Sequence, residues 1–158
     1  MDKKVQLKKP QKERKNAYSH EFCNLSTLDY MKHLGCYYIE SNSETLEKIL
    51  KEVRKKQNSY RVQDELKSRY NSDSFISTDE IIDKLLTSKM LCYYCLKDVC
   101  IFYDKVRQGN QWTLERLDNT IGHTDANTVI SCLDCNLKRR TSNSQAFSFA
   151  KQLVIKKI

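Results

Sequence analysis

The chain has 158 residues and carries 28 Lys and Arg against 20 Asp and Glu, which gives a formal net charge of +8 at pH 7. This excess favours a polyanionic partner such as nucleic acid over an acidic small substrate. No apolar run reaches the length of about 18 residues that a membrane span needs, and residues 1–10 lack the apolar segment of a secretory signal. We therefore expect an intracellular protein, in the cytoplasm or the nucleus, that neither spans a membrane nor follows the secretory route.

Residues 1–16 combine seven Lys and Arg with two acidic residues and almost no apolar side chains. This composition predicts a disordered basic arm. The arm either strengthens nucleic-acid binding by neutralising phosphates or is only a solvated tail.

Residues 17–90 have the patterns of helices. A short amphipathic helix is expected over 25–34, and Ser43 is a plausible N-cap for a longer one. The longer helix has an apolar stripe at helical spacing, formed by Leu46, Ile49, Leu50 and Val53. A second stripe of Val62, Leu66 and Tyr70 predicts another helix, and the capping box from Ser77 to Glu80 opens a further helix that leads to Cys92.

The segment after Cys95 has the composition of strands. Residues 99–106 and 111–117 are rich in β-branched and aromatic types, and the turn signal at 107–110 predicts a β-hairpin between them. A short strand at 128–131 and helical character from 132 to about 155 follow. The expected order is cysteine pair, hairpin, polar loop, strand, cysteine pair, helix.

Two Cys-x-x-Cys pairs, Cys92/Cys95 and Cys132/Cys135, are separated by residues 96–131. In a chain without a signal peptide, such pairs indicate metal binding rather than disulfides, and four thiolates can close a tetrahedral Zn²⁺ site. The remaining cysteines, Cys23, Cys36 and Cys100, are expected to be free thiols, with Cys100 as an alternative ligand.

Several motifs between residues 81 and 142 together resemble one family. They are Glu115-Arg-Leu-Asp-Asn119, Gly122-His-Thr124, Asn127 and Cys132-x-x-Cys-Asn-x-x-Arg139. This combination resembles the zinc-stabilised HNH, or ββα-metal, nucleases, which include phage endonuclease VII and HNH-type proteins of large DNA viruses. The resemblance implies an α+β fold, with a helical N-terminal region (17–90) before a ββα-metal (HNH) core (91–158) in which four cysteines hold a structural zinc.

The same resemblance implies a second, catalytic metal. Glu115 matches the acidic ligand, Asn136 matches the ligand on the helix, and Asn127 matches the residue that braces the loop. Mg²⁺ or Mn²⁺ suits these oxygen ligands, and zinc suits the thiolates.

The sequence departs from the family at Arg116, which stands where the family has its general base, a histidine. Arginine stays protonated and would instead contact phosphate or developing negative charge. His123 is the strongest substitute as a base, because neutral imidazole titrates near working pH. It could also be a histidine that only bonds carbonyl groups, and Asp118 is expected to form an Asx-type turn rather than act as ligand or base.

Three basic residues, Lys138, Arg139 and Arg140, follow Asn136 and are expected either to bind phosphates or to form a solvated face. The aromatic side chains of Tyr93, Tyr94, Tyr103 and Trp112 are expected to be core rather than platforms for bases. The sequence thus predicts a metal-dependent endonuclease that hydrolyses DNA, with double-stranded DNA as its partner. The alternatives are a catalytically degenerate HNH fold that only binds nucleic acid or protein, and a zinc-organised interaction module.

Overall fold

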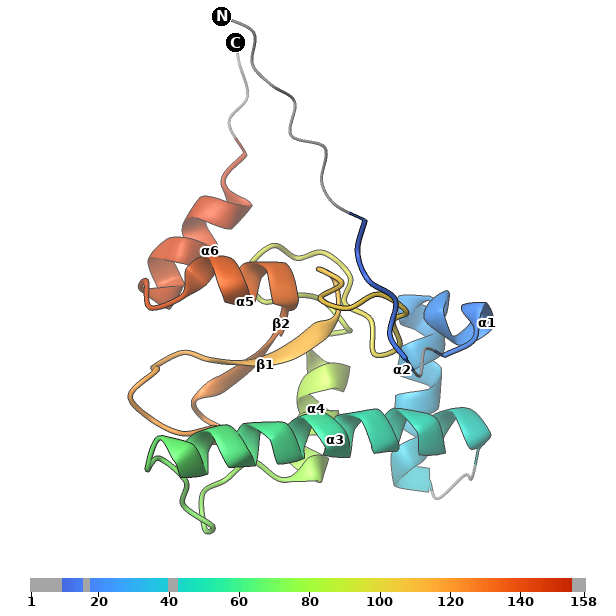
Figure 1. Cartoon of the computed structure of the whole chain (residues 1–158), viewed down its shortest axis with the longest axis horizontal. Helices are drawn as coiled ribbons and strands as arrows, with labels where there is room; N and C mark the ends of the chain where they lie inside the picture. The colour runs from blue at the N-terminus through green and yellow to red at the C-terminus, as the bar shows by residue number, and fades with distance from the viewer. Residues whose placement is uncertain (1–9, 16–17, 40–42, 155–158) are drawn as a thin grey trace, which may run out of the picture.

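A computed structural model describes residues 10–15, 18–39 and 43–154. Its fold is mixed α/β, with helices packed around a two-stranded antiparallel sheet (Figure 1). The elements, in chain order, are α1 (His20–Cys23), α2 (Thr27–Gly35), the 3-10 helix η1 (Cys36–Ile39), α3 (Glu44–Leu66), α4 (Thr78–Thr87), β1 (Trp112–Arg116), β2 (Thr128–Cys132), α5 (Leu133–Arg139) and α6 (Ser144–Gln152).

The helix starts follow local capping chemistry. Ser43 caps α3 by accepting a hydrogen bond from the Leu46 backbone N–H at 3.0 Å. Ser77 and Glu80 form the expected capping box at the start of α4, and Ser26 forms another with Asp29 at the start of α2. Each bond satisfies a backbone N–H that has no partner in the first helical turn. The predicted starts at Ser43 and Ser77 are confirmed.

Helix α3 continues where the sequence pattern predicted two helices. Residues 44–66 contain neither Gly nor Pro and are rich in good helix formers, so nothing interrupts the helix. The predicted second stripe is exposed, because Val62 is 46% and Leu66 is 81% exposed. The end of α3 instead faces the rest of the protein through Tyr60 and the buried Asp64.

The sheet differs from the predicted hairpin. β1 pairs antiparallel with β2, so that Trp112 lies opposite Cys132, Leu114 opposite Ile130, and Arg116 opposite Thr128. Residues 99–106 form no strand, and the hairpin prediction is wrong. The backbone of this segment pairs elsewhere instead: Cys100 forms an isolated parallel bridge with Gln111, and Lys105 forms one with Glu13.

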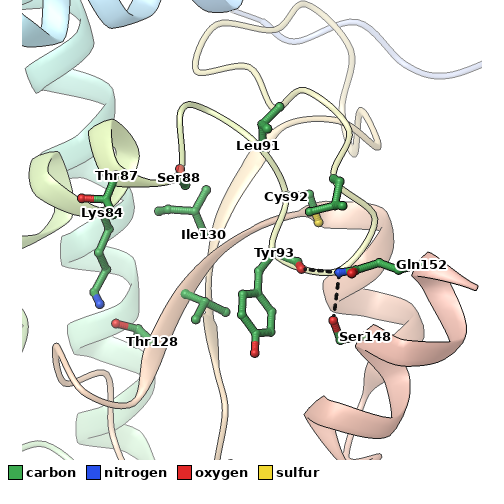
Figure 2. Close-up of a pocket in the computed structure, with 12 residues that line it drawn as sticks. Lys84, Thr87, Ser88, Leu91, Cys92, Tyr93, Thr128, Ile130, Ser148 and Gln152 are labelled. Atoms are coloured by element: carbon green, nitrogen blue, oxygen red, sulfur yellow. Dashed lines mark hydrogen bonds between the residues drawn. The ribbon is translucent and has the colours of Figure 1, made fainter.

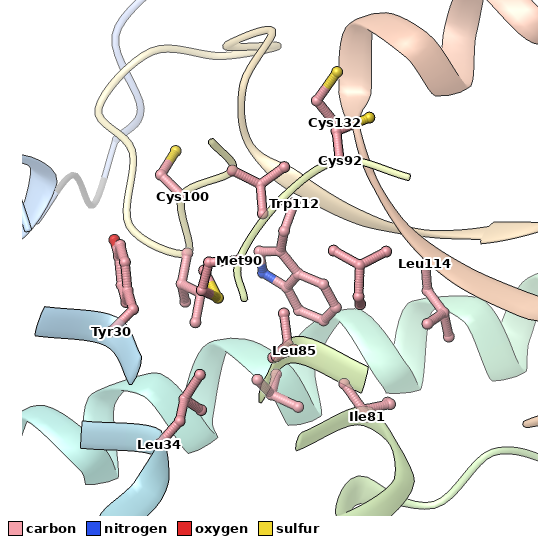
Figure 3. Close-up of a cluster of buried hydrophobic side chains, with 14 of the residues drawn as sticks. Tyr30, Leu34, Ile81, Leu85, Met90, Cys92, Cys100, Trp112, Leu114 and Cys132 are labelled. Atoms are coloured by element: carbon pink, nitrogen blue, oxygen red, sulfur yellow. The ribbon is translucent and has the colours of Figure 1, made fainter. Parts of the chain in front are cut away.

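One hydrophobic core joins the helical segment to the strands. Trp112 and Leu114 extend from β1 toward Ile81 and Leu85 of α4, and the core continues to Tyr30 in α2 (Figure 3). The predicted boundary near residue 90 therefore lies inside a continuous core. In the part of the chain that the structure describes, no helix is long and apolar enough to cross a membrane.

The predicted basic arm lies partly outside the described residues, which begin at position 10. Residues 10–15 lie against the loop at 103–107. There the Arg14 backbone N–H donates to the Asp104 carbonyl oxygen at 2.8 Å, and the Arg14 side chain donates to the Tyr103 carbonyl oxygen at 3.0 Å. The guanidinium also lies 4.1 Å from the centre of the Tyr103 ring. These contacts tie the segment to the body of the protein.

Candidate functional site

The two cysteine pairs come together as expected. The Sγ atoms of Cys92, Cys95, Cys132 and Cys135 all lie within 4.8 Å of one another, and three of these four residues are buried. The second pair spans the junction of β2 and α5, where the Cys135 backbone N–H donates to the Cys132 sulfur at 3.4 Å. The first pair is fixed to β2 by the bond from the Tyr93 N–H to the Ile130 carbonyl oxygen, at 2.9 Å. The cluster could hold a metal ion such as zinc.

The pKa values of two of these thiols are shifted by their close packing. The pKa of Cys92 is lowered, chiefly by a hydrogen bond with Cys132. The same bond, together with burial, raises the pKa of Cys132. A divalent cation at the centre would favour the thiolate form of all four residues, because its charge stabilises several thiolates together.

A polar face lies between β1 and α5. Alternation along β1 sends Trp112 and Leu114 into the core and Thr113 and Glu115 toward α5. The Asn136 amide donates to Thr113 Oγ1 at 3.2 Å, which fixes the first turns of α5 over the strand. Asn136 and Glu115 therefore lie on the same side of the sheet, as the predicted metal site requires.

Glu115 and Arg139 form a buried ion pair. Arg139 Nε donates to Glu115 Oε1 at 2.6 Å, and both side chains are about 5% exposed or less. Burial raises the pKa of Glu115, although Arg139 opposes this by hydrogen bonding and charge. Both contacts from Arg139 go to Oε1, and among the described residues no hydrogen bond is made to Oε2.

His123 is buried and is held by a residue from α3. Its Nδ1 lies 2.9 Å and 3.0 Å from the two carboxylate oxygens of Asp64, and its backbone N–H donates to Asp64 Oδ2 at 2.7 Å. The ring stacks on Tyr60, with ring centres 4.6 Å apart. Because a carboxylate only accepts, Nδ1 carries the proton and Nε2 is the basic nitrogen. Burial is the main reason that the pKa of His123 is lowered.

The loop between the strands is braced by Asn127. Its amide donates to the carbonyl oxygens of Asp118 and Gly122 at 2.9 Å and 3.0 Å, and its Oδ1 accepts from the Asp118 N–H at 2.9 Å. Asp118 accepts from the Thr120 N–H at 2.8 Å, which is an Asx-type turn. Asn127 thus has the bracing contacts that the resemblance implied, and Asp118 has those of a turn residue.

Gly122 lies where the loop meets the end of α3. A Cβ at this position would lie 2.6 Å from the Arg69 carbonyl oxygen and 2.9 Å from Asp64 Oδ2. We expect Gly122→Ala to lower the free energy of unfolding by about 1–3 kcal/mol, because backbone has to move to admit the methyl group. Thermal denaturation measures the change. The matched control is Gly35→Ala, where no atom lies within 4 Å of the added methyl and stability should be equal or higher. Equal stability of the two variants would contradict this close approach.

A pocket of about 240 Å³ collects the candidate residues. Glu115, His123 and Asn136 line it together, although 21 positions separate Glu115 from Asn136 in the sequence. The other lining residues are Tyr60, Gln63, Leu114, Arg116, Asn119, Leu137 and Arg140. Each side of the pocket thus comes from a different element: α3, β1, the loop and α5.

The basic residues differ in position. Arg140 lines this pocket and is exposed, while Arg116 lines it and also lies 3.7 Å from Asp64 Oδ1. Arg139 is only 2% exposed and is paired with Glu115, so its guanidinium is already occupied. Lys138 lines a different hollow, beside Cys95 and Cys135. Arg140 is thus an exposed cation at this pocket, whereas Arg116 is paired with Asp64 and also donates to the Ile121 carbonyl oxygen at 3.3 Å.

A separate groove of about 490 Å³ lies between α4, the first cysteine pair, β2 and α6 (Figure 2). Its sides include Lys84, Tyr93 and Ile130, and Gln152 reaches across it to the Tyr93 carbonyl oxygen at 3.3 Å. None of Glu115, His123 and Asn136 lines this groove. The expected aromatic core is confirmed for Trp112 and Tyr94, which are fully buried, whereas Tyr93 is 41% exposed.

Sequence reasoning missed Asp64, Tyr60 and Asn119 at the site. Asp64 and Tyr60 are four residues apart on α3, so they share one face, and a polar residue at such a position is more often solvated. Asn119 donates to the Arg140 carbonyl oxygen at 2.9 Å and so links the loop to the end of α5. Comparisons of the chain with protein-family models, curated proteins and solved structures found no match.

Proposed function

We propose that the protein is a metal-dependent endonuclease of HNH type that hydrolyses phosphodiester bonds in DNA. The observation that carries this proposal is the convergence of Glu115, His123 and Asn136 on one small pocket with Arg116 and Arg140. In this proposal the ββα order of β1, β2 and α5 is the HNH core, and the four cysteines hold a structural Zn²⁺.

Glu115 and Asn136 would hold a hard divalent ion, Mg²⁺ or Mn²⁺, through carboxylate and amide oxygens. When bound, this ion neutralises charge on the phosphate and on the leaving oxygen. His123, with Nδ1 fixed by Asp64, takes a proton from the attacking water at Nε2. Arg140 and Arg116 lie on the pocket wall, where they can stabilise the negative charge that develops on the phosphate.

Nicking of supercoiled plasmid in Mg²⁺ or Mn²⁺ tests the proposal. We expect His123→Ala and Asn136→Ala to lower the rate by about 10²–10⁴-fold, the usual contribution of a positioned acid–base group or ligand. The matched controls are His20→Ala and Asn58→Ala, at exposed positions outside the pocket, and they should nick like the wild type. Absence of metal-dependent nicking by the wild type, or equal rates in His123→Ala and His20→Ala, would sink the proposal.

A second candidate is a catalytically degenerate HNH fold that binds nucleic acid without cutting it. The ion pair of Glu115 with Arg139 favours this alternative, because a metal ion would compete with the guanidinium for the carboxylate. Salt-sensitive DNA binding without products in Mg²⁺ or Mn²⁺ would support it.

A further inference from the structure

A second groove, of about 450 Å³, opens beside the candidate site along α3. It shares Tyr60, Gln63 and Asn136 with the pocket that His123 lines, so the two hollows adjoin. Residues of α3, β1 and α5 line the groove, and Figure 1 shows α3 running below β1 and α5. We name this surface the α3 groove; its other lining residues are Arg14, Glu52, Lys55, Lys56, Ser59, Tyr103, Gln111, Thr113 and Leu133.

The charge of the α3 groove is positive. Arg14, Lys55 and the amine of Lys56 line it together with one carboxylate, Glu52, which is paired with Arg14. That carboxylate is only 5% exposed and is already engaged, because it accepts from the Tyr18 hydroxyl at 2.9 Å and lies 3.5 Å from Arg14. The remaining wall carries amide and hydroxyl groups. Such a lining suits the oxygens of a phosphodiester backbone.

We propose that the α3 groove binds the backbone of the nucleic-acid strand next to the phosphate in the candidate site. This inference deepens the proposed function and rests on it for the place of that phosphate. Lys55 and Ser59 lie four residues apart on the groove face of α3, at the spacing of one helical turn. Asn136 of α5 lines both hollows.

Lys56 supports this assignment from the floor of the groove. Its ammonium donates to Gln111 Oε1 at 3.2 Å and to the Trp112 carbonyl oxygen, so it is fixed rather than solvated. Burial lowers its pKa to about 7, against the opposing charge of Glu52. A phosphate beside this amine would favour its charged form.

Fluorescence anisotropy of labelled oligonucleotides, at low salt and in buffer without Mg²⁺ or Mn²⁺, tests the proposal without any need for cleavage. The groove variants Lys55→Glu and Ser59→Glu are compared with Arg54→Glu and Asn58→Glu, which make the same changes at neighbouring exposed positions outside the groove. We expect the groove variants to weaken binding at least about 5-fold more than their controls. Loss of one phosphate contact should also reduce the salt slope by about one unit in Lys55→Glu.

Binding is measured with single-stranded and double-stranded oligonucleotides of DNA and of RNA. The comparison shows which kind of nucleic acid the groove binds. The inference is overturned if each groove variant binds as its control does, or if the wild type binds none of these oligonucleotides. If the groove variants weaken binding but the wild type never nicks DNA, the proposed function is wrong and the inference about the α3 groove holds. If Lys55→Glu and Ser59→Glu bind and nick DNA as the wild type does, the inference about the α3 groove fails and the proposed function stands.

Discussion

Chelation of the Zn²⁺ proposed for the cysteine cluster is expected to abolish cooperative unfolding of the strands and α5. Structural zinc contributes on the order of 10 kcal/mol in small zinc domains, as much as the whole stability of a typical domain. Here Cys92 and Cys132 are buried in the core beside Trp112, and α5 has only seven residues, too few for a stable isolated helix. Thermal melts followed by near-UV circular dichroism, before and after chelation, measure the loss.

Cys132→Ser should reproduce the effect of chelation. The matched control is Cys36→Ser, because Cys36 lies outside the cluster and donates only to the Lys32 carbonyl oxygen at 3.3 Å. We expect one Zn²⁺ per chain in the wild type and in the control, and none in Cys132→Ser. A metal-free protein that melts like the wild type, or equal melts for the two variants, would contradict a structural metal site.

Replacement of Asp64 by Asn is expected to lower the nicking rate by about 10²-fold or more. The carboxylate accepts from His123 Nδ1, and an Asn amide can donate there instead, which would place the proton on Nε2 and remove the base. Glu65→Gln is the matched control, since Glu65 is exposed and pairs only with Arg61 at 3.7 Å. Equal rates for the two variants would show that Asp64 does not position the base.

The pH profile separates this positioning role from a general loss of structure. Since burial lowers the pKa of His123, the base form is already present at pH 7, and the wild-type rate should fall only as pH drops below about 6.5. Asp64 stabilises the imidazolium, so Asp64→Asn should move this acid limb to still lower pH while the plateau falls. A lower plateau with an unmoved acid limb would argue for misfolding, which zinc content and melting temperature would also report.

The parts of the fold that depend on neighbouring residues could be predicted from the sequence. Ser43 and the box from Ser77 to Glu80 mark helix starts because each cap bonds a backbone group three residues away. The strand predicted at 128–131 is found at 128–132. The four cysteines gather as their paired spacing predicted. These features need no knowledge of distant contacts.

The parts that depend on distant partners could not be predicted. Asp64 meets His123 across 59 positions, and nothing in α3 marks one of its many polar residues as buried. Arg139 was expected at phosphates or in solvent, yet it closes onto Glu115, 24 positions away. The segment 99–106 has strand composition, but its backbone forms isolated bridges to Gln111 and Glu13, and β1 pairs with β2 instead.

The ion pair of Glu115 and Arg139 bears directly on the proposed catalytic metal site. Glu115 could hold an ion with Oε2 while its Oε1 stays bonded to Arg139. The buried guanidinium would then remain paired, and an unpaired buried charge costs about 3–5 kcal/mol. Arg139 would then orient the carboxylate rather than compete with it. Glu115→Gln should consequently reduce both nicking and stability.

The central claim is that His123 acts as the base of a metal-dependent nuclease, and chemical rescue tests it most directly. Cleavage of a labelled duplex in Mg²⁺ or Mn²⁺ is followed for the wild type and for His123→Gly, with and without added imidazole. We predict cleavage by the wild type, loss of about 10²-fold or more in the variant, and partial recovery that rises with the concentration of neutral imidazole. A variant that cleaves at the wild-type rate, or a wild type that yields no product with either metal, would contradict the claim.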